Sequence, residues 1–212
     1  ETLMMNADTA MYHAKRAGRN QLSYYAPVMN AKLKATLQME TDLRKAINDH
    51  ELFLVYQPIF NVRHQAMVGV EALVRWRKPD GSMVFPDEFI PVAEQTGLIV
   101  ALGDYVLEQS CKQLQQWHKK GLDLSMSVNV SPAQLRDSDF VSLLQHCLKH
   151  YSLNPLKIQL ELTEQIFIEN SEELVSSLDT IANMGVHLAI DDFGTGYSSL
   201  SYLQKLSVDV LK

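Results

Sequence analysis

Apolar and polar positions along the chain follow two different periods. Spacings of three and four residues between apolar positions predict helices over 27–48, 100–119, 139–150, 171–185 and 198–206. Short apolar runs, some alternating with polar residues, predict strands over 53–60, 67–76, 124–131, 157–164, 187–192 and 208–212. Residues 85–97 (FPDEFIPVAEQTG) are rich in turn residues and predict an irregular connection.

The order of these elements indicates the fold class. Short apolar strands that alternate with helices predict an α/β fold of parallel βα units with right-handed crossovers. An open doubly wound sheet and a closed barrel both satisfy the pattern. A (β/α)8 barrel needs eight units, so a barrel formed by this chain would contain about six of them.

Polar residues gather toward the carboxyl ends of the predicted strands. In chain order they are Glu71 and Arg75, Asn129 and Ser131, Glu161 and Glu164, Asp191 and Asp192, and Lys212. A single acid at such a place is commonly a turn or surface residue. Five consecutive units with the same feature favour a functional site, because the carboxyl ends of barrel strands are where catalytic groups gather.

The adjacent pair Asp191 and Asp192 narrows the chemistry of that site. Two like charges about 4 Å apart cost roughly 4 kcal/mol at an effective dielectric constant near 20. Either some of the carboxyl groups are protonated, or a cation lies among them. Oxygen ligands without histidine suit Mg²⁺, Mn²⁺ or Ca²⁺ rather than zinc. We therefore expect a divalent-metal site, and a bridging aspartate favours two ions.

Composition and charge exclude several classes of function. A net charge of −6 argues against binding to a nucleic-acid polymer, which usually needs a basic surface. Two cysteines, Cys111 and Cys147, are too few for a disulfide framework and favour a reducing, cytoplasmic setting. No apolar run approaches the roughly 20 residues that span a bilayer. The glycines at 194–196 do not match a phosphate-binding P-loop and predict a flexible loop instead.

Six short motifs stand in order along the successive predicted strands. They are YQP (56–58), GVEALVRW (69–76), SVNVS (127–131), ELTE (161–164), DDFGTGYSSL (191–200) and VDVLK (208–212). Together they resemble the EAL-domain family, from about residue 40 to the end of the chain. The resemblance implies a modified TIM (β/α)8-type barrel that acts in bacterial second-messenger signalling. It also implies hydrolysis of cyclic di-GMP to linear 5′-pGpG with Mg²⁺ or Mn²⁺ at a two-metal site.

The same resemblance implies roles for individual residues. The metal ligands would be Glu71, Asn129, Glu161, Asp191 and Asp192. The ligand-binding positions would be Gln57, Leu73 and Arg75. Lys212 matches a lysine that activates or orients the attacking water. Glu164 matches a glutamate that steadies the loop at 193–199.

The N-terminal segment carries a second resemblance. Residues 7–25 (ADTAMYHAKRAGRNQLSYY) resemble the closing segment of a GGDEF (diguanylate cyclase-type) domain, and a basic amphipathic helix with an edge strand is the alternative. We expect residues 1–26 to be the remnant of such a domain, 27–49 a linker helix and 50–212 an EAL domain. The GGDEF signature itself is absent from the chain, so no cyclase activity is assigned.

The resemblance leaves a second function open. The chain stops at Lys212, before the last two strands and a further glutamate ligand, so we expect this polypeptide alone to be inactive. A cyclic di-GMP phosphodiesterase is favoured because every visible ligand position is intact. The alternatives are an inactive EAL module that binds cyclic di-GMP and signals to a partner, and a purely structural dimerising domain. We expect the protein to form a homodimer through the EAL domain. We also expect a longer cytoplasmic parent protein with GGDEF and sensor domains upstream. If the parent is bound to a membrane, a domain outside this chain would anchor it there.

Overall fold

The computed structural model describes residues 2–16, 20, 22–167, 172–194 and 208–212. The chain divides into two compact units, Glu1–Lys45 and Ala46–Lys212. The first unit contains helix α1 (Thr2–Arg16) and most of helix α2 (Pro27–Asn48). The bounds of α2 are those that the sequence predicted. The second unit contains all the strands and every candidate site residue.

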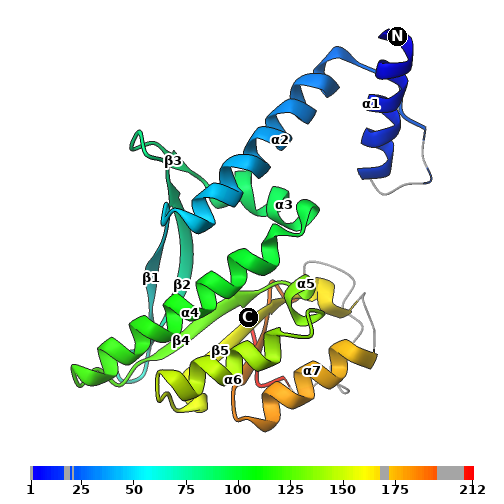
Figure 1. The fold of residues 1–212 in the computed structure, drawn as a ribbon. Coiled ribbons are helices and arrows are strands. Elements are labelled where there is room, and N and C mark those ends of the chain that lie inside the picture. The colour runs from blue at the N-terminus through cyan, green and yellow to red at the C-terminus, as the bar shows by residue number, and fades with distance from the viewer. Residues whose placement is uncertain (1, 17–19, 21, 168–171, 195–207) are drawn as a thin grey trace. The chain divides into compact units, whose positions relative to one another are not determined.

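One sheet organises the second unit (Figure 1). Its strands are β1 (Leu52–Asn61), β2 (Ala66–Arg77), β3 (Met83–Val84), β4 (Ser125–Val130), β5 (Ile158–Thr163), β6 (His187–Asp191) and β7 (Val210–Leu211). Their order is β1-β2-β4-β5-β6-β7, with β3 paired to β2. β1 and β3 run antiparallel to β2, and the other neighbours are parallel. The predicted α/β fold with a parallel-strand sheet is confirmed, whereas closure into a barrel stays a prediction.

Helices connect the parallel strands and cover the sheet. They are α3 (Pro86–Thr96), α4 (Leu98–Lys119), α5 (Pro132–Leu135), α6 (Phe140–His150), α7 (Glu172–Asn183) and the 3-10 helices η1 (Pro155–Lys157) and η2 (Glu164–Phe167). In Figure 1, α4, α6 and α7 lie in front of the central strands. Within the described ranges, no helix combines the length and the apolar character that crossing a membrane requires.

The expectation of an irregular connection over 85–97 is wrong, because α3 occupies that stretch. Pro86 takes the first helical position, where its missing N–H costs nothing. The Glu88 side chain accepts a hydrogen bond at 3.2 Å from the N–H of the residue that precedes the helix. Phe89 is fully buried, and its ring meets the edge of Trp76 at 5.7 Å. Burial of this face outweighs the turn preference of the individual residues.

Most other predicted elements agree with the structure within a few residues. Gly185 follows α7 with a φ of 88°, a left-handed conformation that ends helices and suits glycine. The helix predicted over 198–206 lies outside the described residues. β3 and α5 were not predicted, because elements of two and four residues are too short to show a period.

Strand alternation decides which side chains can reach the site. Leu162 of β5 stands opposite Ile190 of β6, and both are buried. Neighbouring residues on a strand point to opposite faces. Glu161 and Asp191, each next to one of these apolar residues, therefore project from the other face of the sheet.

Gly69 allows β2 and β4 to approach each other closely. A Cβ at this position would lie 2.3 Å from Ser125 Oγ and 3.0 Å from Ser125 O. We predict that Gly69→Ala lowers the free energy of unfolding by about 1–3 kcal/mol, because β4 must shift to accept the methyl group. Urea denaturation measures the change. Adding Ser125→Ala removes the nearest atom and should recover part of the loss, whereas wild-type stability for Gly69→Ala would contradict the prediction.

Candidate active site

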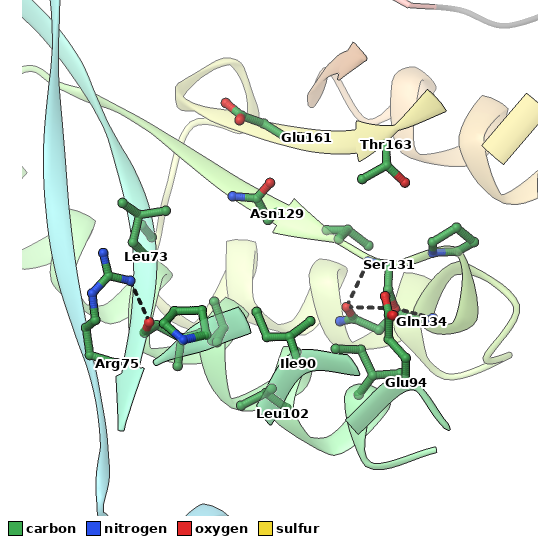
Figure 2. Close-up of a pocket in the computed structure, with 18 residues that line it drawn as sticks. Leu73, Arg75, Ile90, Glu94, Leu102, Asn129, Ser131, Gln134, Glu161 and Thr163 are labelled. Carbon is green, nitrogen blue, oxygen red and sulfur yellow. Dashed lines mark hydrogen bonds between the residues drawn. The ribbon is translucent and has the colours of Figure 1, made fainter. Parts of the chain in front are cut away.

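A pocket of about 280 Å³ lies where β2, β4 and β5 end (Figure 2). Five residues that the sequence nominated line it: Leu73, Arg75, Asn129, Ser131 and Glu161. Much of its remaining wall is apolar and comes from α3 and α4, with Ile90 and Leu102 as examples. The structure therefore brings part of the expected ligand-binding set and part of the expected metal-binding set to one place.

Glu71 and Asn129 form a polar pair across β2 and β4. The Asn129 side-chain amide donates from Nδ2 to Glu71 Oε1 at 2.8 Å. Glu71 stands opposite Ser127 in the register, so Asn129 is its diagonal neighbour on the same face. Glu71 Oε2 and the Asn129 side-chain carbonyl are further oxygens of this pair, and oxygens of both kinds are ligands that hard cations take.

Glu161 is a buried carboxylate, with an exposed fraction of 1%. Its Oε1 accepts a hydrogen bond from Gln159 Nε2 at 3.1 Å and forms an ion pair with Lys212 Nζ. Its Oε2 is buried and has no hydrogen-bond partner among the described residues. Leaving a buried polar atom without a partner costs about 1–3 kcal/mol, and more for a charged group. One carboxylate oxygen of Glu161 therefore has its partners and the other does not, a half-satisfied state in which Oε2 can bind one more cation or hydrogen-bond donor.

Lys212 reaches Glu161 across the intervening strand β6. The backbone N–H of Lys212 donates to the Ile190 carbonyl at 2.9 Å, which attaches the residue to β6. Ala189 of β6 stands opposite Glu161 on one side and opposite Val210 on the other. Because the Ala189 side chain is a single methyl group, it leaves room for the lysine to pass over β6.

Asp191 ends β6, and Asp192 follows it directly at a bend in the chain. Asp191 Oδ1 accepts the Asp192 N–H at 3.0 Å. Asp192 has a φ of 55°, in the left-handed region that aspartate tolerates better than most residues. This local hydrogen bond occupies Asp191 Oδ1, and the expected role of the pair as metal ligands stays a prediction.

Glu164 contacts the backbone just after this bend. Its side chain is buried, and its Oε2 accepts the Gly194 N–H at 3.2 Å. The expected role of Glu164 in steadying the loop at 193–199 stays a prediction, since the loop from residue 195 onward lies outside the described part of the chain.

The expected set of metal ligands, which includes the Asn129 amide, stays a prediction. In the described ranges, no three carboxylate, imidazole or thiol side chains are close enough to hold an ion. Gln57 faces the same side as its strand partner Glu71 but does not line the pocket. The donor chemistry nevertheless fits a hard divalent cation, because all five expected ligands offer oxygen and Glu161 has an oxygen without a partner.

The cap that joins Ser131 to Gln134 in the pocket wall was not predicted, because the sequence showed Ser131 only as a polar residue at a strand end. Ser131 caps α5 through reciprocal bonds with Gln134: the Gln134 N–H donates to Ser131 Oγ at 3.3 Å, and the Ser131 N–H donates to Gln134 Oε1 at 3.1 Å. A Cβ at Gly103 of α4 would lie 1.8 Å from Gln134 Nε2, so glycine is needed for this close approach. The letters SPAQ at 131–134 are a capping-box signature with proline at the first helical position and could have revealed it.

Asp104 and Tyr56 are among the titratable groups with shifted pKa values on elements that border the site. Burial raises the pKa of Asp104, and the charges of Asp137 and Asp139 act in the same direction. Burial also raises the pKa of Tyr56 to about 12, with a smaller contribution from Tyr105. Tyr56 therefore stays neutral at physiological pH and serves as a packing residue of β1.

Comparisons with known proteins match this arrangement. MucR of Pseudomonas aeruginosa, named a bifunctional diguanylate cyclase/cyclic di-GMP phosphodiesterase, is 42% identical over 211 residues, which are 99% of this chain and 31% of MucR. PdeR of Escherichia coli, named a cyclic di-GMP phosphodiesterase, is 39% identical over 210 residues, 99% of this chain and 32% of PdeR. The solved structure of the MucR phosphodiesterase in a c-di-GMP complex has a TM-score of 0.76 at 39% identity, and covers 82% of this chain and 71% of that one.

These relatives are longer than the chain, which spans about a third or less of their length. The likeness to the MucR structure supports a fold like that of the TIM-barrel EAL structures. A model of the EAL domain matches residues 40–212, which hold the whole sheet and all the candidate site residues. The chain therefore belongs to the EAL-domain family.

Proposed function

We propose that this chain carries the site of a cyclic di-GMP phosphodiesterase, which hydrolyses one phosphodiester bond to give linear 5′-pGpG. The observation that carries the proposal is the pocket in which the half-satisfied carboxylate of Glu161 lies with Asn129 and Arg75. Two relatives named as cyclic di-GMP phosphodiesterases and a related structure in a c-di-GMP complex support it.

Arg75 and Leu73 suit an anionic ligand with flat aromatic bases. The Arg75 guanidinium donates from Nη1 to the Val74 carbonyl at 2.8 Å, which fixes the group at the pocket wall. A guanidinium has five N–H donors and matches phosphate oxygens well. Because the chain has a net charge of −6, attraction of an anion must come from local cations such as Arg75 and Lys212. Leu73 adds apolar surface, and Gln57 is proposed to contact the ligand from β1.

The proposed metal ligands are Glu71, Asn129, Glu161, Asp191 and Asp192. Bound Mg²⁺ or Mn²⁺ would lower the pKa of a bridging water and neutralise charge on the phosphate oxygens. The ammonium of Lys212, held beside Glu161, orients the attacking water and stabilises negative charge as it develops. Glu164 fixes the backbone at Gly194, directly after the two aspartates.

The proposal extends to the rest of the protein. Residues 1–26 are the end of a GGDEF-like domain, 27–49 a linker helix and 50–212 the EAL domain, which forms a homodimer. The name of MucR, a bifunctional cyclase and phosphodiesterase, supports an upstream GGDEF domain. Such a protein acts in cytoplasmic second-messenger signalling.

Metal removal tests the oxygen-ligand site. The full-length protein should convert cyclic di-GMP to pGpG only with Mg²⁺ or Mn²⁺, and Ca²⁺ should inhibit because its coordination is looser and more variable. Chromatography of the products with each ion and with excess chelator gives the answer. Full activity in chelator contradicts the metal assignment, and tight binding of cyclic di-GMP without any pGpG favours the inactive binding module.

Replacement of Glu71 tests its assignment as a metal ligand. Glu71→Ala should lower kcat on the order of 100-fold or more, because a ligand to the metal is lost, while the melting temperature changes little. Glu172→Ala, an exposed glutamate on α7, is the matched control and should keep wild-type activity. A Glu71→Ala protein with normal turnover would show that the assignment is wrong.

Replacement of Arg75 separates binding from chemistry. Arg75→Ala should raise the Kd for cyclic di-GMP about 10- to 100-fold and leave the rate of the bound complex nearly unchanged, as expected for a phosphate contact. Arg77→Ala is the control, since Arg77 stacks on the Phe53 ring at 4.8 Å outside the pocket. An unchanged Kd with a collapsed rate would exclude the proposed role.

A further inference from the structure

The pairing of β7 with β6 is short. β7 consists of Val210 and Leu211, which stand opposite Ala189 and Ile190. A pairing of two residues makes few ladder hydrogen bonds with which to specify the strand register. A contact beside so short a strand therefore adds to what fixes its alignment on β6.

Asp209, the residue before β7, supplies that contact. Its backbone N–H donates to the Leu188 carbonyl at 2.9 Å, and its carboxylate Oδ2 accepts the Leu188 N–H at 2.9 Å. One residue of β6 thus has both its backbone groups bonded to one aspartate. The same Oδ2 lies 3.3 Å from His187 Nδ1, which holds the carboxylate against the start of β6.

The position of Lys212 depends on this alignment. Lys212 follows β7 directly, and its Nζ pairs with Glu161 on the far side of β6. A slip of one residue would move the backbone by about 3.3 Å and turn each side chain of β7 to the opposite face of the sheet. The lysine would then leave Glu161 and the pocket.

We propose that Asp209 is a positioning residue for Lys212: its carboxylate fixes the register of β7 on β6 and so holds the ammonium beside Glu161. The inference rests on the proposed function, in which Lys212 orients the attacking water. Asp209 itself does not line the pocket, so its effect should fall on turnover and not on ligand binding.

Two substitutions of Asp209 in the full-length protein test the idea. Asp209→Ala removes the acceptor for the Leu188 N–H and should lower kcat on the order of tenfold or more, because displacement by about 1 Å can cost up to 100-fold. KM and the Kd for cyclic di-GMP should stay within about twofold of wild type. Asp209→Asn keeps a side-chain oxygen as the acceptor and should restore kcat to within about threefold.

A second measurement reports on position without activity. Hydrogen exchange followed by mass spectrometry should show faster exchange for peptides that contain 208–212 in Asp209→Ala and near-normal exchange in Asp209→Asn. Asp123→Ala is the matched control, since it removes an exposed carboxylate that pairs with Lys157 Nζ at 2.8 Å near the start of β5. It should leave kcat and the exchange of 208–212 unchanged.

The following results would overturn the inference that Asp209 positions Lys212. Normal kcat and normal exchange in Asp209→Ala would show that the register does not need this carboxylate. Equal losses in Asp209→Ala and Asp209→Asn would exclude the backbone acceptor as the cause, and loss of ligand binding or of folding would make Asp209 a general structural residue. Failure of the proposed function looks different: the wild-type protein would form no pGpG, whatever exchange shows for Asp209. A normal kcat for Lys212→Met would refute the role of Lys212 alone.

Discussion

The buried carboxylate of Glu161 is the constraint on which the rest of the site depends. A charge at 1% exposure must be compensated within the fold, because burying an unpaired ion is strongly unfavourable. Gln159 and Lys212 satisfy one oxygen, and the other has no partner among the described residues. The ion pair between Glu161 and Lys212 depends on three features of the sheet. They are the position of β7 next to β6, the small side chain of Ala189 between the two partners, and the register of β7.

The pocket around Glu161 joins two kinds of surface. Apolar residues from α3 and α4 form one wall, and the polar ends of β2, β4 and β5 form the other. Such a division suits a ligand with flat aromatic rings and charged phosphate groups, because the apolar wall can contact the ring faces and the polar wall can bind the phosphates. α3 therefore has a direct part in the site, and its buried Phe89 attaches the helix to β2 through Trp76.

The sequence predicted the strands and the polar residues at their ends well, because both depend on short-range patterns. The helix at 85–97 was missed, since the preference of its prolines for turns gives no information on the burial of Phe89. The pairing of Lys212 with Glu161 across β6 depends on the register of three strands, which no local pattern encodes. The hydrogen bond from the Asp192 N–H to Asp191 Oδ1 and the positive φ of Asp192 were not predicted either, because a turn conformation depends on the backbone angles of single residues.

The most direct test is a crystal structure of the full-length protein with Mn²⁺ and cyclic di-GMP. The half-satisfied state of Glu161 predicts an anomalous scattering peak at about 2.1 Å from its Oε2, a distance typical of small divalent cations and oxygen. A phosphate of the ligand should lie on the other side of that ion. A fully bound ligand with no metal at Glu161 would contradict the account.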